Sequence, residues 1–191
     1  MSAVAERIAT NGGLSGEERR RFLCGVLDQI AAGCRRILVV PPDFTRFNSG
    51  AGEITAIVYE YLTPDASVDI MPALGTHVPM TAEERRLMFG AAIPDEAFKV
   101  HDWRNNLNYL GTVPAERILE LSEGKLDYTV DVEIDAVLFD SYDLILSVGQ
   151  VVPHEVVGMA NYTKYFCVGV GGRDIINKSH FLGAVYGMER I

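Results

Sequence analysis

The chain alternates between short apolar runs and longer segments in which apolar residues recur at helical spacing. The runs predict buried strands at 36–40, 67–71, 143–148 and 165–170, and a shorter strand at 97–101. The helical spacing predicts one helix that begins at Ser15, a second over 53–62 and a third that begins at Thr81. Ser15 and Thr81 each precede a glutamate by three residues, which is the pattern of a capping box at a helix start.

Strands that alternate with helices are typical of one class of fold. We expect an α/β domain with an open, mainly parallel sheet flanked by helices, in a three-layer Rossmann-like arrangement that spans residues 1–191. The segment 125–139 alternates apolar and polar residues, which predicts a hairpin or a pair of edge strands. In open parallel sheets, ligands bind beyond the carboxyl ends of the strands.

Composition and charge exclude several classes of function. The 191 residues carry a net charge of −9, which disfavours binding to nucleic acids and to anionic membranes. The three cysteines show no CxxC spacing and predict neither disulfides nor a zinc site. No apolar run approaches the roughly 18 residues of a membrane span, and the first residues lack the apolar core of a signal peptide. We therefore expect a cytoplasmic protein that acts on a small molecule.

Polar residues that suit catalysis follow the predicted strands. Asp43 and Arg46 follow the first strand, His77 follows the second, and His154 follows the strand at 143–148. An imidazole can act as acid, base or metal ligand near neutral pH, and the guanidinium fork of arginine suits a carboxylate or phosphate. Each residue also has a purely structural interpretation, such as a local Asp43–Arg46 ion pair. Their shared position at strand ends predicts one common site.

The stretch from 149 to 184 adds an amine and another imidazole. Lys164 is flanked by aromatic residues, and apolar surroundings lower the pKa of a lysine and make it a nucleophile or attachment point. His180 follows the glycines of VGVGG, which lacks the full spacing of a dinucleotide-binding loop. A surface lysine ahead of a strand remains the alternative interpretation of Lys164.

Taken together, these residues resemble the N-terminal domain of the lactate racemase family, whose members use a nickel-pincer nucleotide. The matching pieces follow the family's order: Asp43-x-Thr45-Arg46, Gly75-Thr76-His77, His101-Asp102, Pro153-His154, Lys164 and His180. The resemblance implies that Lys164 carries the nucleotide covalently and that His180 is the nickel ligand. It implies that His77 and His154 are the acid–base pair, and that Asp43 and Arg46 help to hold cofactor or substrate.

The implied reaction is racemisation or epimerisation of a 2-hydroxy acid. Hydride leaves the substrate carbon for the cofactor and returns to the opposite face, while the two histidines move the hydroxyl proton. Phe47 and Val78 depart from the family pattern, which favours a substrate other than lactate. The resemblance also implies partner enzymes that synthesise the cofactor, and a second, C-terminal domain of the family that these 191 residues do not contain.

Two other hypotheses remain open at the level of sequence. The first is a binding module that keeps the fold and the pocket without catalysis. The second is a metal-dependent hydrolase that uses the same histidines. It requires carboxylate ligands beside them, for which Asp102 is the candidate.

Overall fold

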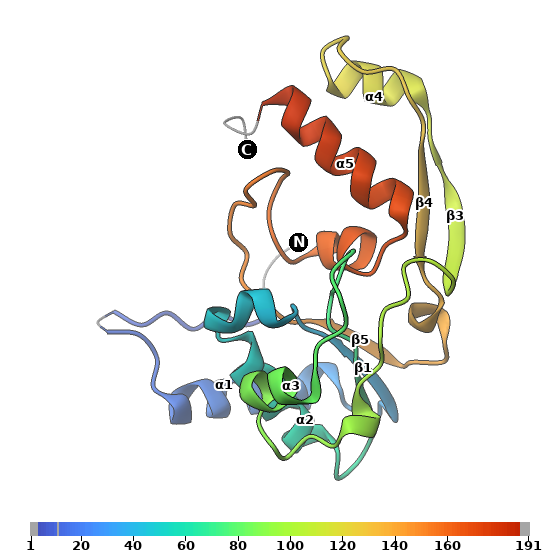
Figure 1. Ribbon diagram of the computed structural model, residues 1–191. Coiled ribbons are helices and arrows are strands. Elements are labelled where there is room, and N and C mark those ends of the chain that lie inside the picture. Colours follow the sequence, from blue (N-terminus) through green and yellow to red (C-terminus); the bar gives the residue numbers. More distant parts are fainter. Residues whose placement is uncertain (1–3, 11, 188–191) are drawn as a thin grey trace.

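A three-stranded parallel sheet lies at the centre of the computed structural model, which describes residues 4–10 and 12–187 (Figure 1). Its order is β2–β1–β5, formed by Ser67–Ile70, Arg36–Val40 and Leu144–Ser147. In β1, Ile37 pairs with Val68 on one side and with Leu144 on the other. Three of the predicted strands and the parallel α/β class are therefore confirmed.

The central strand β1 is covered on both faces, as expected of a parallel sheet. Ile37 and Val39 face a core that contains residues of α1 (Gly16–Ile30), α2 (Ala51–Leu62) and α3 (Ala82–Phe89). Leu38 and Val40 face a second core that contains residues from the later part of the chain. All four side chains are 0 % exposed, and burial of each such side chain contributes roughly 1.5–3 kcal/mol.

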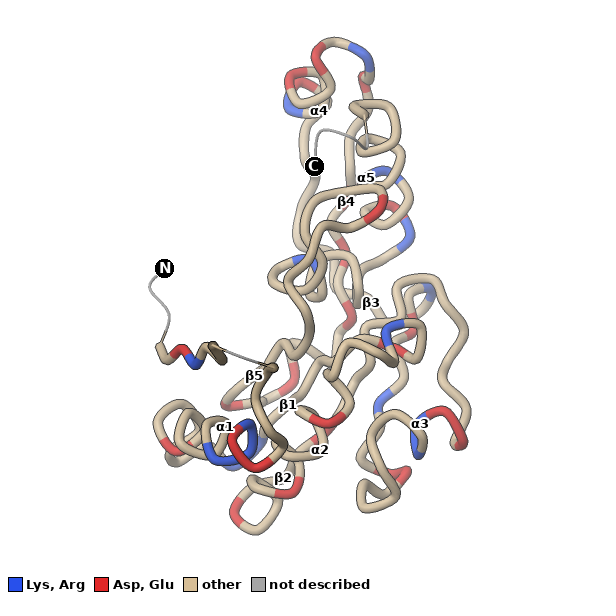
Figure 2. The backbone as a smooth tube through the Cα atoms, turned by 90° about the vertical axis from the view of Figure 1, so that its left-hand side faces the viewer, with Lys and Arg blue, Asp and Glu red and all other residues tan. Residues whose placement is uncertain are grey.

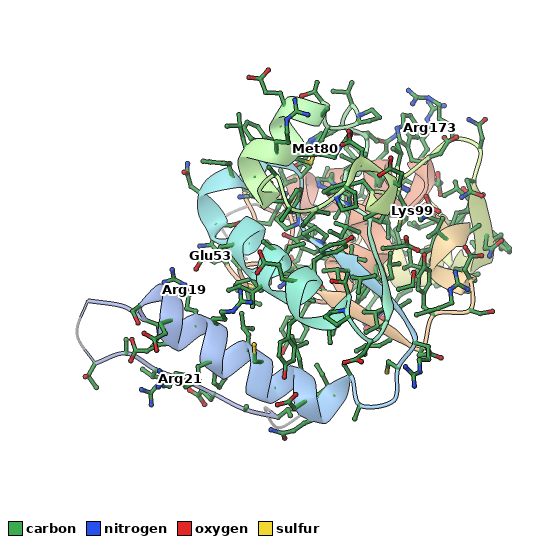
Figure 3. All side chains as sticks on the ribbon, turned by 90° about the horizontal axis from the view of Figure 1, so that it is seen from below. Arg19, Arg21, Glu53, Met80, Lys99 and Arg173 are labelled. Carbon is green, nitrogen blue, oxygen red and sulfur yellow. The ribbon has the colours of Figure 1, made fainter. Side chains whose placement is uncertain are left out.

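Local signals in the sequence set the starts of α1 and α3. At Ser15, the hydroxyl accepts a hydrogen bond from the Glu18 N–H at 3.3 Å, and the Glu18 carboxylate accepts one from the Ser15 N–H at 2.9 Å. Thr81 and Glu84 repeat this pattern. Both predicted capping boxes are confirmed, and each N-cap contributes about 1 kcal/mol. Arg19 of α1 also binds Glu53 of α2 at 2.9 Å, which joins the two helices on the surface (Figure 3).

An antiparallel ribbon extends away from the parallel sheet (Figure 1). It consists of β3 (Leu107–Val113) and β4 (Val130–Asp135), which are joined through α4 (Ala115–Leu121). The segment 125–139 therefore contains one strand, β4, and not the predicted hairpin or pair of strands; its partner β3 was not predicted. β3 is largely exposed and carries Asn108 and the bulge residue Gly111, so its apolar pattern is weak.

Two predicted strands are wrong. Residues 165–169 form a π-helical segment, η4 (Tyr165–Gly169), followed by the helix α5 (Arg173–Tyr186). A short apolar run has the same pattern in a buried strand and in a buried helical turn, which explains the error. In the segment 97–101, only Phe98 pairs, in an isolated bridge with Ile70. His180 therefore lies on a helix, and not at the border of a strand.

The remaining helical segments are short turns. Turns of 3-10 helix lie at Phe44–Ser49 (η1), Asp95–Ala97 (η2) and Ala136–Phe139 (η3).

Acidic and basic residues lie side by side on α1, α3 and α4 (Figure 2). Within the described residues, no helix has the length and apolar character that a membrane crossing requires.

Candidate active site

The loops at the carboxyl ends of the three parallel strands surround a cavity of about 840 Å³, together with η4 and α5. All six residues predicted for the site line this cavity: Asp43, Arg46, His77, His154, Lys164 and His180. They come from segments that are up to 137 positions apart in the sequence, so only the fold brings them together.

Asp43 fixes the orientation of His77. The Oδ2 atom of Asp43 lies 2.7 Å from Nδ1 of His77, and its Oδ1 atom accepts a hydrogen bond from the Thr45 N–H at 3.2 Å. The Asp43 side chain is 8 % exposed, whereas the His77 ring is 57 % exposed. Because a carboxylate accepts hydrogen bonds, Nδ1 of His77 carries a hydrogen. In the neutral ring this leaves a lone pair on Nε2, as a general base requires.

In His154 the ring hydrogen lies on the opposite nitrogen from that in His77. Its Nδ1 atom accepts hydrogen bonds from the backbone N–H groups of Val156 at 3.2 Å and Val157 at 3.4 Å. The ring hydrogen is therefore on Nε2, which lies 3.5 Å from the Glu155 carboxylate. Burial is the largest cause that lowers the pKa of His154, and the positive charge of Lys164 is the next. The ring is therefore mainly neutral near pH 7.

His180 lies beside His154 on the wall formed by α5. The two rings meet edge to face, with centroids 5.5 Å apart. Nδ1 of His180 donates a hydrogen bond to the Ile176 carbonyl at 2.7 Å, one turn earlier in the helix. This bond fixes the tautomer and leaves the Nε2 lone pair free, with no partner in the described part of the chain. A ring held in this way is typical of a histidine that binds a metal.

Lys164 is a half-buried amine in the same cavity. Its Nζ atom donates a hydrogen bond to the Val157 carbonyl at 2.9 Å. Burial lowers the pKa of Lys164 from 10.5 to about 8, the Glu155 charge opposes this change and the Arg46 charge adds to it. A large fraction of the amine is therefore neutral under mildly alkaline conditions and can act as a nucleophile.

Asn161 positions the segment that carries Lys164, and sequence reasoning missed it. Its side chain is buried, and its backbone is in the left-handed conformation, with φ of 63°. The Asn161 amide donates a hydrogen bond to the Gly149 carbonyl at 2.7 Å and also accepts one from the Ser147 hydroxyl. The loop is thereby attached to the end of β5. Asparagine adopts this left-handed conformation more readily than most residues do. Apart from this tendency, the sequence does not indicate the role of Asn161.

Arg46 and Glu155 form a second feature that sequence reasoning missed. The guanidinium of Arg46 lies 3.4 Å from the Glu155 carboxylate, which is 68 % exposed. The local Asp43–Arg46 ion pair, which was the alternative interpretation of these two residues, is not among the ion pairs of the described residues. Arg46 instead contacts the loop that follows β5, through Glu155. No spacing in the sequence indicates this contact.

His101 does not take part in the site. Its ring is fully buried, with Nδ1 lying 2.7 Å from Asp135 and Nε2 lying 3.1 Å from the Gly171 carbonyl. The adjacent Asp102 binds Asn105 and does not line the cavity, so it is not placed to serve as the carboxylate ligand that the hydrolase hypothesis assigned to it. Among residues 4–10 and 12–187, no group of three or more His, Cys, Asp or Glu side chains could hold a metal ion.

Comparison with known families identifies the relatives of this chain. The family model of the lactate racemase N-terminal domain matches residues 22–189. The chain belongs to this family. The match includes all six predicted site residues.

Solved structures share the fold of this lactate racemase N-terminal domain. A Thermotoga maritima protein, solved by a structural genomics consortium, has a TM-score of 0.79 and 24 % identity over 91 % of this chain and 42 % of its own. The lactate racemase apoprotein from Thermoanaerobacterium thermosaccharolyticum has a TM-score of 0.60 and 23 % identity over 81 % and 37 %. The chain thus spans less than half the length of either protein. Among curated proteins, no match was found.

Proposed function

We propose that this chain carries the catalytic residues of a racemase or epimerase. The enzyme would invert the configuration of a 2-hydroxy acid by hydride transfer to a nickel-pincer nucleotide. One observation carries the proposal: a single cavity contains an amine with a lowered pKa and three imidazoles with different hydrogen-bonding partners. Membership of the lactate racemase family supports this class of chemistry.

The residues present fit the proposed cofactor. The Lys164 amine suits covalent attachment because burial keeps part of it neutral. The free Nε2 lone pair of His180 suits nickel, which binds imidazole well. The remaining donors to nickel would belong to the nucleotide itself. When bound, the nucleotide supplies the hydride acceptor and donor that protein side chains lack.

His77 and His154 are proposed to move the hydroxyl proton of the substrate. His77 presents a lone pair at Nε2 and receives the proton, while the Asp43 carboxylate stabilises the positive charge that the ring gains. His154 presents an N–H at Nε2, which can donate a hydrogen bond to a substrate oxygen. The roles exchange for the opposite enantiomer, which requires a proton on Nδ1 of His154 and the release of its two backbone bonds.

Arg46 is proposed to bind the substrate carboxylate. Its guanidinium lines the cavity between the two histidine-bearing loops, and Arg–carboxylate pairs are strong and directional. A carboxylate held there would keep the planar keto form of the substrate in the cavity while its carbonyl group turns about the bond to the carboxylate, which exposes the opposite face. This role explains why a protein with net charge −9 can still accept an anion.

The test is to produce the chain together with the enzymes that synthesise the cofactor, and then to measure intact mass and nickel content. We expect a covalent adduct that maps to Lys164, and retained nickel. Lys164→Ala should lose the adduct, whereas the control Lys125→Ala, at an exposed lysine of the α4–β4 connection, should keep it. His180→Ala should keep the adduct and lose nickel. Unmodified Lys164 under conditions that load a known family member would refute the proposal.

A further inference from the structure

The Glu155 side chain lies where the proposed substrate carboxylate would bind. Its Oε2 atom is 3.4 Å from the Arg46 guanidinium, and its Oε1 atom is 3.5 Å from Nε2 of His154. These two groups are a cation and an N–H donor. The carboxylate of Glu155 thus spans the same pair of partners that the proposed function gives to a 2-hydroxy acid.

The charge state of Glu155 supports this interpretation. Its own backbone N–H is the largest cause that lowers the pKa of the carboxyl group, and the positive charge of Arg46 lowers it further. Glu155 is therefore an anion at neutral pH. The same charge acts on the neighbouring Lys164 amine, whose pKa it raises.

The contact is weak enough to exchange with a ligand. The Glu155 side chain is 68 % exposed and that of Arg46 is 42 % exposed. Exposed ion pairs of this kind contribute little to stability, and both contacts are longer than a normal hydrogen bond. Glu155 also lies between β5 and η4 in a loop, so its side chain can turn toward solvent without breaking a helix or a strand.

We infer that Glu155 is an internal competitor for the anion site, which occupies Arg46 and His154 until a carboxylate ligand displaces it. This inference rests on the proposed function, because it takes Arg46 as the group that binds the substrate carboxylate. Glu155 then sets the apparent affinity for substrate: its charge excludes weakly bound anions, and the substrate must displace it to bind.

The sign of one measurement distinguishes competition from a supporting role. Glycolate, the smallest 2-hydroxycarboxylate, is titrated into the chain without cofactor, and its Kd is measured by calorimetry at pH 7.5. We expect Glu155→Gln to bind glycolate about 3- to 10-fold more tightly, the gain expected when a weak competing ion pair is removed. If Glu155 merely positioned Arg46, the same substitution would weaken binding.

Two controls isolate the charge effect. Glu17→Gln removes the same charge from an exposed ion pair on α1, and it should leave the glycolate Kd unchanged. Arg46→Gln should weaken glycolate binding. When Glu155→Gln is added to Arg46→Gln, the gain in glycolate affinity should be smaller than in the parent chain, because Arg46, the partner for which Glu155 and glycolate compete, is gone. Glycolamide, which lacks the negative charge, should gain no affinity from Glu155→Gln.

The outcomes separate the two proposals. Equal glycolate affinity in the parent chain and in Glu155→Gln would overturn the role of Glu155 and leave the anion site intact. Weaker binding in Glu155→Gln would overturn it as well. Absence of glycolate binding in both proteins would overturn the inference together with the role of Arg46, while the mass and nickel measurements would still decide the cofactor chemistry.

Discussion

The reactivity of Lys164 tests the electrostatics of the site before any cofactor is present. Its pKa is lowered from 10.5 to about 8, and burial is the largest cause. At pH 8 about half of this amine is neutral, compared with about 0.3 % of an ordinary lysine, which is an excess of roughly 150-fold. Nucleophilicity falls as pKa falls, with a slope of about 0.4–0.5 for thiols, so the net advantage is about tenfold if amines follow the same slope.

The assay is brief acylation with a limiting amount of an amine-reactive reagent between pH 6.5 and pH 10.5, followed by peptide mass spectrometry. A short lysine-containing model peptide in the same mixture is the reference, because its amine has the ordinary pKa of a lysine. We expect labelling of Lys164 to reach half of its maximum near pH 8, and labelling of the model peptide to continue rising to the end of the range.

A matched substitution identifies the cause of the shift. The positive charge of Arg46 helps to lower the pKa of Lys164, so Arg46→Gln should move the half-maximal pH of labelling upward. Glu155→Gln should move it downward, because the Glu155 charge acts in the opposite direction. A profile of Lys164 in the parent chain that coincides with that of the model peptide would show that the cavity does not desolvate the amine, and the argument from burial would fail.

Two further substitutions test the acid–base pair and the packing around it. Asp43→Asn removes the carboxylate that orients His77, so turnover by the loaded enzyme should fall about 10²-fold with little change in KM, and nitrogen NMR should show loss of the Nδ1–H form of the ring. Gly183→Ala would place a methyl group 2.5 Å from the Val156 carbonyl and should lower the free energy of unfolding by about 1–3 kcal/mol in urea titration, whereas Gly25→Ala in the open part of α1 should raise it by about 0.5–1 kcal/mol.

The parallel sheet and the convergence of its loops could be predicted because they depend on local patterns. Residues 37–40 of the run RILVV are buried on both faces, and such a run has few structural alternatives in an α/β chain. The rule that ligands bind beyond the carboxyl ends of parallel strands then placed Asp43, His77 and His154 around one cleft. Hydrophobic periodicity and the topology of a parallel sheet were sufficient for this prediction, without knowledge of any contact distance.

The segment that follows Lys164 could not be predicted in this way. The run YFCVGV contains the residues of a strand, yet its partners are the apolar side chains of a layer formed by distant parts of the chain. Gly171 and Gly172 pack so closely that a side chain at either position would meet Cys167 or Glu133 within 3 Å. These glycines are therefore required for close packing between η4, β4 and α5, and not for a phosphate loop.

This difference changes how the proposed metal ligand, His180, is held. A strand over 165–170 would leave His180 in a loop, where its ring could adopt many orientations. In the structure, η4 turns the chain directly into α5, and the helix places the Ile176 carbonyl one turn before His180, where it fixes the Nδ1 hydrogen. The proposed nickel ligand thus owes its tautomer to helix geometry. A histidine one position away along α5 would lie about 100° around the helix and could not replace it.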